Sequence, residues 1–154
     1  VLWQATKGQG LLRNGIAWKM QPRGKELVFT YDRSFESHPE RCRVLTELEN
    51  YAESIGLKGV TASQFGGAVI NACHSLESAP GCHFKFAKPQ EGGGSIWDYA
   101  ATACLYEEGG AVVSDVHGDP LDLNRHDSTF MNHRGAVYAT DQALAVKIRD
   151  ILVV

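Results

Sequence analysis

The chain has 154 residues, of which 44% are hydrophobic and 21% are charged, and its formal net charge at pH 7 is −3. This length and composition are those of one folded globular domain, and they exclude disordered, collagen-like and coiled-coil polypeptides. We also expect neither a nucleic-acid polymer nor a membrane as partner, because no basic cluster is present and no apolar run approaches the roughly 20 residues that span a bilayer.

Residues 1–20 predict short β-strands that are separated by glycine. Asn14-Gly15 is the strongest local signal, because both residues tolerate the positive φ values of tight hairpin turns. The chain opens at Val1 in strand-like residues, with no initiator Met, basic segment or apolar signal core. We therefore expect neither a secretory nor a transit peptide, and we interpret the start as that of a cut chain. The stretch 22–24 breaks the strand pattern and marks a domain boundary.

From residue 25 onward, strand-like and helix-like segments alternate. The strand segments are short and cover 26–31, 57–62, 82–86, 111–114 and 136–139. The helical segments have apolar residues at spacings of three and four and cover 37–55, 65–76, 95–107 and 141–151. Ser37 or His38 is suited to cap the first helix, with Pro39 in its first turn, and Asp141 to cap the last. This alternation predicts an α/β fold in which helices flank a layered, largely parallel or mixed sheet.

The cysteines indicate the redox environment of the chain. They show no C-x-x-C spacing, and most lie in apolar stretches, where a free thiol behaves as a small hydrophobic group. The four are Cys42, Cys73, Cys82 and Cys104. We therefore expect a reducing compartment and a cytoplasmic protein.

A glycine-rich loop at 91–95 leads into a helix that carries Asp98 in its first turn. Dinucleotide-binding, phosphate-loop, nucleophile-elbow and zinc-protease motifs do not occur in the sequence. Asp98 has two interpretations. As a structural residue it offsets the positive end of the helix dipole and contributes about 0.3 to 1 kcal/mol. As a functional residue it offers an oxygen ligand to Mg²⁺, which binds one or two carboxylates together with phosphate oxygens and water.

Other polar groups near the C-terminus have weaker functional interpretations. His126 and His133 flank an aspartate, but their segment lacks the ligand spacing of a metal site, and a polar loop explains them better. Asn132, His133 and Arg134 precede the last strand, where Arg134 either reaches a substrate at the carboxyl edge of the sheet or pairs with a nearby acid. Glu107-Glu108 stands at the C-terminal end of a helix, where negative charge interacts unfavourably with the helix dipole. A solvated face or packing therefore explains this pair better than catalysis.

The segment around Asp98 resembles the second signature of the inositol monophosphatase family. That signature reads W-D-x-A-A and continues along a helix to E-A-G-G, and here Trp97–Ala101 and Glu107–Gly110 stand at the matching spacing. Three further regions resemble the family in the same order along the chain. They are Ala5–Gly10 with Asn14-Gly15 (A-x-x-G-x-G and N-G), Gly66–Val69 (G-[ST]-A-A), and Val113–Asp115 with Gly118–Leu121 (V-T-D and G-x-P-L). The resemblance covers essentially the whole chain.

This resemblance implies a fold, an activity and a set of site residues. The implied fold is the C-terminal α/β domain of the inositol monophosphatase-like fold in residues 25–154, preceded in residues 1–24 by terminal strands of a largely missing N-terminal sheet domain. The implied activity is Mg²⁺-assisted hydrolysis of an inositol phosphate, a sugar phosphate or a 3'(2'),5'-bisphosphate nucleotide. By the same resemblance, Asp98 is a magnesium ligand and Glu91 meets a substrate hydroxyl. The backbone of Gly67-Ala68 approaches the substrate.

The chain departs from the family pattern in three ways. Gly67 replaces the usual Ser or Thr, so a side-chain contact is lost there, and the stretch His74–Pro89 carries extra residues beside the substrate pocket. The upstream glutamate pair and the D-P-x-D-G-T motif, which supply most metal ligands in the family, do not occur in the sequence. One carboxylate cannot hold two metal ions and also activate a water. We therefore expect most catalytic residues to lie in a missing N-terminal half.

Three hypotheses follow from these observations. The first is the C-terminal part of a phosphatase that is inactive as this chain alone. The alternative is a non-catalytic module that binds a phosphate ligand and lacks the metal centre, and a third is one piece of a nicked or truncated protein. The expected partners are a small phosphorylated substrate and either a second copy of the chain or the missing N-terminal half.

Overall fold

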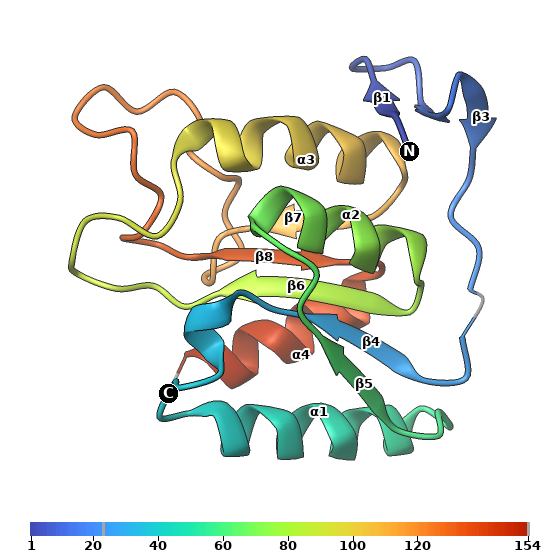
Figure 1. The fold of residues 1–154 in the computed structure, drawn as a ribbon, viewed down its shortest axis with the longest axis vertical. Coiled ribbons are helices and arrows are strands. Elements are labelled where there is room, and N and C mark those ends of the chain that lie inside the picture. Colours follow the sequence, from blue (N-terminus) through green and yellow to red (C-terminus); the bar gives the residue numbers. More distant parts are fainter. Residues whose placement is uncertain (23, 154) are drawn as a thin grey trace.

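Two β-sheets and four α-helices make up the computed structural model, which describes residues 1–22 and 24–153 (Figure 1). The larger sheet has five strands in the order β5-β4-β6-β8-β7. These strands are β4 (Leu27–Thr30), β5 (Val60–Ser63), β6 (Gly81–Lys85), β7 (Val112–Ser114) and β8 (Ala136–Ala139). β4 runs parallel to β5 and β6, whereas β8 runs antiparallel to β6 and β7. The mixed sheet that the sequence predicts is therefore confirmed.

Helices cover both faces of this sheet. In Figure 1, α1 (Arg41–Ser54) and α4 (Gln142–Leu152) lie on one side of it, and α2 (Ala68–Glu77) and α3 (Ile96–Glu108) lie on the other. α4 has an amphipathic pattern, because Leu144, Ala145, Ile148 and Ile151 are all buried on one helix face. They join a cluster of apolar side chains from β4, β6 and α1. The fold is thus a layered α/β arrangement, as predicted.

The helix ends test the capping predictions. Asp141 caps α4 as predicted, because its Oδ1 accepts a hydrogen bond from the backbone N–H of Leu144 at 2.9 Å. The predicted start of the first helix at residues 37–39 is wrong, since α1 begins at Arg41. His38 precedes Pro39, and the residue before a proline disfavours the helical conformation. Its ring stacks on Phe86 outside the helix, with 4.2 Å between ring centroids.

Two other elements also begin later than predicted. α2 begins at Ala68 rather than at residue 65, because Gly67 has an extended backbone with ψ of 179°. β5 begins at Val60 rather than at residue 57, after Gly59 with φ of +146°. The predicted boundary at 22–24 falls partly outside the described residues, because it includes residue 23.

A small antiparallel sheet precedes the main one. Its strands, in spatial order, are β1 (Trp3–Ala5), β2 (Leu11–Arg13) and β3 (Ile16–Trp18). The predicted hairpin is confirmed, with φ of +51° at Asn14 and +78° at Gly15 in the turn between β2 and β3. The indole rings of Trp3 and Trp18 meet edge to face with 5.0 Å between centroids. Leu11 is buried in the cluster that includes residues of α2 and α3.

The side chain of Glu108, near the end of α3, joins the small sheet to the rest of the fold. Its Oε1 accepts a hydrogen bond from the N–H of Gly8 at 2.6 Å, and its Oε2 accepts one from the N–H of Gly10 at 2.7 Å. These two bonds satisfy the backbone of the loop between β1 and β2. Glu108 therefore has a structural role, in line with the sequence interpretation that favours packing or a solvated face over catalysis.

This attachment is expected to depend on pH. Hydrogen bonds from Gly8 and Gly10 hold the pKa of Glu108 below its ordinary value of 4.5. The ionised form thus stabilises the attached sheet above about pH 4.5, and this contribution is lost as the pH falls through the lower folded-state pKa. Glu108→Gln should remove the charge at neutral pH and expose Trp3 and Trp18.

Tryptophan fluorescence in a Trp97→Phe background would measure this change, because it reports only the two sheet tryptophans. The matched control is Glu107→Gln, since Glu107 is exposed and makes neither bond to the loop. Equal spectra for both variants at all pH values would contradict the role of Glu108.

Within the described residues, no helix is both long and apolar enough to cross a membrane. All four cysteines are free thiols. Burial raises the pKa of the Cys82 thiol, so this group stays protonated inside the core.

Candidate functional site

Two cavities lie at the carboxyl ends of the parallel strands. Cavity 1 has a volume of about 210 Å³ and cavity 2 of about 510 Å³. Both are lined by Asp32 and Ser34, which follow β4, and by Lys85, which ends β6. In open α/β sheets the carboxyl ends of the strands are the usual ligand-binding edge. The two cavities are therefore the candidate site of this fold.

Cavity 2 collects three of the four site residues that the sequence predicts. Its lining also includes the first residues of α2 and α3, where backbone N–H groups have no partner within the helix. The lining residues are Asp32, Arg33, Ser34, Gln64, Gly66, Gly67, Ala68, Lys85, Gly94 and Asp98. Asp98, Gly67 and Ala68 thus meet at one place although they belong to two motifs that are well separated along the chain.

Asp98 has a structural role in addition to its place in cavity 2. It is the third residue of α3, and its Oδ2 accepts a hydrogen bond from the backbone N–H of Ser95 at 2.8 Å. This contact is the reciprocal half of a capping box, which satisfies an N–H group at the helix start. The side chain is only partly exposed. The two interpretations of Asp98 are therefore compatible, since one carboxylate oxygen serves the cap and the carboxylate also faces the cavity.

Gly67 and Ala68 present backbone to cavity 2. Gly67 is the N-cap residue of α2, and no side chain caps this end of the helix. The glycine at this position leaves the first turn of α2 accessible, and the space where a Cβ atom would stand at Gly67 is open, with no other atom within 4 Å. The helix start therefore offers N–H donors and the positive end of the helix dipole to an anion in cavity 2.

Glu91 lies apart from the other predicted residues. It is exposed, its Oε1 accepts a hydrogen bond from the hydroxyl of Ser128 at 3.1 Å, and it lines neither cavity. The glycines that follow it, 92–94, all have positive φ values. At Gly94 this conformation brings the backbone against the Tyr99 hydroxyl, so a side chain there would collide with the ring.

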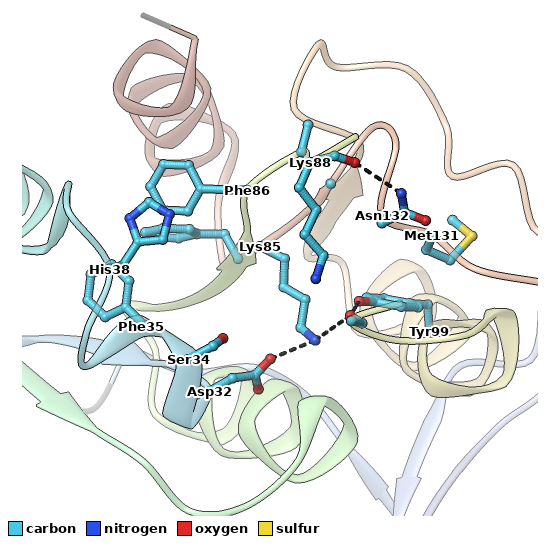
Figure 2. A pocket seen from close by; sticks show the side chains of 14 residues that line it. Asp32, Ser34, Phe35, His38, Lys85, Phe86, Lys88, Tyr99, Met131 and Asn132 are labelled. Carbon is cyan, nitrogen blue, oxygen red and sulfur yellow. Dashed lines mark hydrogen bonds and ion pairs between the residues drawn. The ribbon is translucent and has the colours of Figure 1, made fainter. Parts of the chain in front are cut away.

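Sequence reasoning missed a charged pair where the two cavities meet. The Nζ of Lys85 lies 2.6 Å from Oδ2 of Asp32 and donates a hydrogen bond to the carbonyl oxygen of Gly93 at 2.7 Å (Figure 2). Both side chains are about one-fifth exposed. Each residue stands at or just after the end of a predicted strand, and this position is the only sequence signal that points to them.

Two buried groups keep the surroundings of the site neutral. Burial raises the pKa of the Tyr99 phenol, which stays protonated and donates a hydrogen bond to the Gly93 carbonyl at 3.2 Å. Burial also lowers the pKa of His83, although Asp32 and the Thr30 carbonyl oppose this effect. The His83 Nδ1–H donates to that carbonyl at 2.8 Å. The net charge of the site therefore comes from its Asp, Lys and Arg side chains.

The residues present fit part of a Mg²⁺ site. Asp98 and Asp32 supply two carboxylates to the lining of cavity 2, and Mg²⁺ takes one or two carboxylates together with phosphate oxygens and water. Asp32, however, is already paired with Lys85. Across residues 1–22 and 24–153, no three His, Cys, Asp or Glu side chains gather as a metal-binding group. The described residues thus provide at most two of the carboxylates that a magnesium centre would need.

The segment 125–134 forms ion pairs rather than a metal site. Arg125 binds the carboxylate of Asp127 at 2.6 Å and contacts the ring of His133. Arg134 binds the carboxylates of Asp115 and Asp119, which is the second of its two predicted interpretations. From this segment, Met131 and Asn132 reach the site, as part of the lining of cavity 1.

The sequence is similar to known inositol monophosphatases. No family model matches the chain. Over 127 residues it is 27% identical to human inositol monophosphatase 2, a match that covers 79% of this chain and 40% of that protein. The rat protein of the same name is 26% identical over 125 residues. The chain thus spans less than half the length of the curated relatives it matches.

Solved structures show the same relation at the level of the fold. An inositol monophosphatase from Anabaena matches with a TM-score of 0.62 and 20% identity, over 97% of this chain and 55% of that one. Inositol monophosphatase II from Staphylococcus aureus matches with a TM-score of 0.67 and 15% identity, over 98% of this chain and 51% of that one. The described chain therefore has the fold of about half of these proteins.

Proposed function

We propose that this chain, which is similar to inositol monophosphatases in sequence and in fold, is the C-terminal part of a Mg²⁺-dependent phosphomonoesterase. One observation carries the proposal. Asp98, Gly67 and Ala68, which the sequence pattern selects, line one cavity at the carboxyl ends of parallel strands. The substrate is a phosphate ester of inositol, a sugar or a 3'(2'),5'-bisphosphate nucleotide, and the protein acts in the cytoplasm.

The four residues that the sequence pattern selects and Lys85 each have a proposed part in this site. Asp98 contributes a carboxylate oxygen to the Mg²⁺, which when bound polarises the phosphate and lowers the pKa of water. The N–H groups at the start of α2, at Gly67-Ala68, orient the substrate through hydrogen bonds. Lys85, paired with Asp32, offsets negative charge where the two cavities meet, and Glu91, which lines neither cavity, accepts a hydrogen bond from a substrate hydroxyl.

A second candidate is a binding module that holds a phosphate ligand without hydrolysis. The Lys85–Asp32 pair favours it, because an ammonium group takes up one of the two carboxylates that would face a metal ion. An N-terminal half with further carboxylates, or a second copy of the chain, is the partner that would complete a catalytic centre.

Activity measurements on two lengths of protein separate these candidates. The 154-residue chain should show no turnover above background with Mg²⁺ on a panel of inositol phosphates, sugar phosphates and nucleotide bisphosphates, because it supplies too few carboxylates. A protein extended by the upstream reading frame should hydrolyse at least one of them in a Mg²⁺-dependent manner.

Turnover by the 154-residue chain alone would contradict the need for an N-terminal half. Phosphate-ester binding without turnover by the extended protein would favour the binding module. The molar mass of the chain in solution, measured by light scattering, distinguishes a homodimer from a monomer that awaits another partner.

A further inference from the structure

We propose that cavity 1 binds the planar ring of the substrate, so that the phosphate ester at this site is a nucleoside phosphate rather than a polyol phosphate. This inference rests on the proposed function, because it requires the phosphate end of the ligand to lie in cavity 2. Cavity 1 contains none of the four site residues that the sequence predicts. From the glycine-rich loop and the helix after it, only Gly93 and Tyr99 line this cavity.

Aromatic side chains form one wall of cavity 1. Phe86 and His38 stack with 4.2 Å between centroids and 14° between planes. Phe35 and Phe84 pack edge to face behind them, at 6.5 Å and 81°. Figure 2 shows Phe35, Phe86 and His38 on one side of the cavity and Tyr99 with Met131 on the other. Aromatic rings bind other planar rings by stacking or edge-to-face contact, and a thioether sulfur adds favourable contact with ring edges.

The size of the cavity suits one ring. Cavity 1 measures about 210 Å³, which is below the roughly 300–1,000 Å³ of sites that hold a whole drug-sized ligand. It adjoins the larger cavity 2 through the shared residues Asp32, Ser34 and Lys85. A ligand of two parts, one ring and one phosphorylated sugar, therefore matches the two connected spaces.

Cationic groups lie where the anionic part of such a ligand would pass. Arg33 lines cavity 2, and Lys85 stands at the junction of the cavities, where its charge is already paired with Asp32. Lys88 lines cavity 1 and not cavity 2, and in Figure 2 its side chain extends into the space between the aromatic wall and Tyr99, where an ammonium group favours the face of a bound aromatic ring. A phosphate group gains charge-assisted hydrogen bonds from ammonium and guanidinium groups.

The aromatic wall of cavity 1 suits a ring better than a polyol. Hydroxyl groups that leave water need hydrogen-bond partners, and this wall supplies none, although Ser34 and Asn132 elsewhere in the lining are polar. The single carboxylate of the lining, that of Asp32, is held by Lys85. Glu91 is exposed and lines neither cavity, so it supplies no carboxylate to a polyol in cavity 1.

Binding to the 154-residue chain tests this inference without any need for catalysis. Isothermal titration with AMP, ribose 5-phosphate and myo-inositol 1-phosphate isolates the ring, because AMP and ribose 5-phosphate differ only by the base. AMP should bind about tenfold more tightly than either of the other two, since stacking of one base on an aromatic side chain has this order of effect.

Variants locate the effect in cavity 1. Phe86→Leu keeps an apolar side chain and should reduce AMP binding to the level of ribose 5-phosphate, whereas Phe65→Leu, an exposed ring that lines neither cavity, should not. Arg33→Met, in the lining of cavity 2, should weaken both phosphates equally, and Lys19→Met, on the exposed surface outside both cavities, should weaken neither. Circular dichroism confirms that each variant is folded.

Equal binding of AMP and ribose 5-phosphate, tighter binding of the inositol phosphate, or no binding of any probe would each overturn the inference. None of these results decides the proposed phosphatase function, which the turnover of the extended protein measures. Conversely, AMP binding without turnover in the extended protein would support the ring site and contradict the enzyme.

Discussion

In a protein that carries the whole proposed site, replacing Asp98 by Asn is expected to lower kcat by about a thousandfold, or about 4 kcal/mol. The variant removes the negative charge that cavity 2 offers to Mg²⁺, and metal-derived stabilisation of the transition state amounts to several kcal/mol. The fold should stay intact, because the Asn amide oxygen still accepts the hydrogen bond from the N–H of Ser95. The loss of the favourable interaction with the helix dipole is about 1 kcal/mol or less.

Two measurements separate catalysis from stability at this position. The Mg²⁺ dependence of kcat should shift in Asp98→Asn, while its thermal unfolding stays near that of the parent protein. Asp122→Asn is the matched control, because Asp122 is exposed and lies outside both cavities. A variant that unfolds readily and keeps its kcat when folded would show that the capping box is the whole role of Asp98.

Gly135→Ala is expected to lower the free energy of unfolding by about 2 to 5 kcal/mol, the sum of a backbone and a packing effect. Gly135 has φ of +61°, which costs an L-residue about 1 to 2 kcal/mol. A methyl group there would also lie 2.7 Å from Cγ1 of Val116 and 2.8 Å from the backbone nitrogen of Ala87, and it would collide with the carbonyl oxygen of Lys85. Overpacking of this kind costs about 1 to 3 kcal/mol.

Urea unfolding measures this loss against a control with similar backbone strain. Gly110 has φ of +76°, but a methyl group there would meet no atom within 4 Å, so Gly110→Ala should lose only the conformational part, about 1 to 2 kcal/mol. The same size of loss in both variants would mean that crowding at Gly135 is relieved without cost. Because Gly135 also lines cavity 1, its variant should weaken AMP binding even when folded.

Local chemistry explains which parts of the fold are predictable. The hairpin turn follows from Asn14-Gly15, and the start of α4 follows from Asp141, because both signals lie within a few residues of the structure they produce. The start of α1 has no such local signal, because its N-cap residue, Glu40, makes no side-chain capping bond. The preceding His38 stacks instead on Phe86, which is distant along the chain. The pattern of apolar and β-branched residues likewise predicts where the strands lie, but it does not predict the order in which they pair.

The candidate site divides in the same way. Asp98, Gly67 and Ala68 belong to short motifs that a resemblance can select, and the structure brings them to one cavity. The Lys85–Asp32 pair and the aromatic wall of cavity 1 are made of residues with no motif of their own. They meet only because β4 and β6 are parallel neighbours that end at the same edge.

The antiparallel direction of β8 determines how this binding edge can change over evolutionary time. Because β8 starts beside the end of β6, with Ala136 opposite Lys85, the long connection from β7 arrives at the same edge and contributes Met131 and Asn132 to cavity 1. The starts of α2 and α3, by contrast, line cavity 2. Substitutions in the β7–β8 connection can thus alter the lining of cavity 1 while the lining of cavity 2 stays unchanged. The binding edge is therefore divided into one part built by a long loop, which tolerates sequence change, and one part built by helix starts.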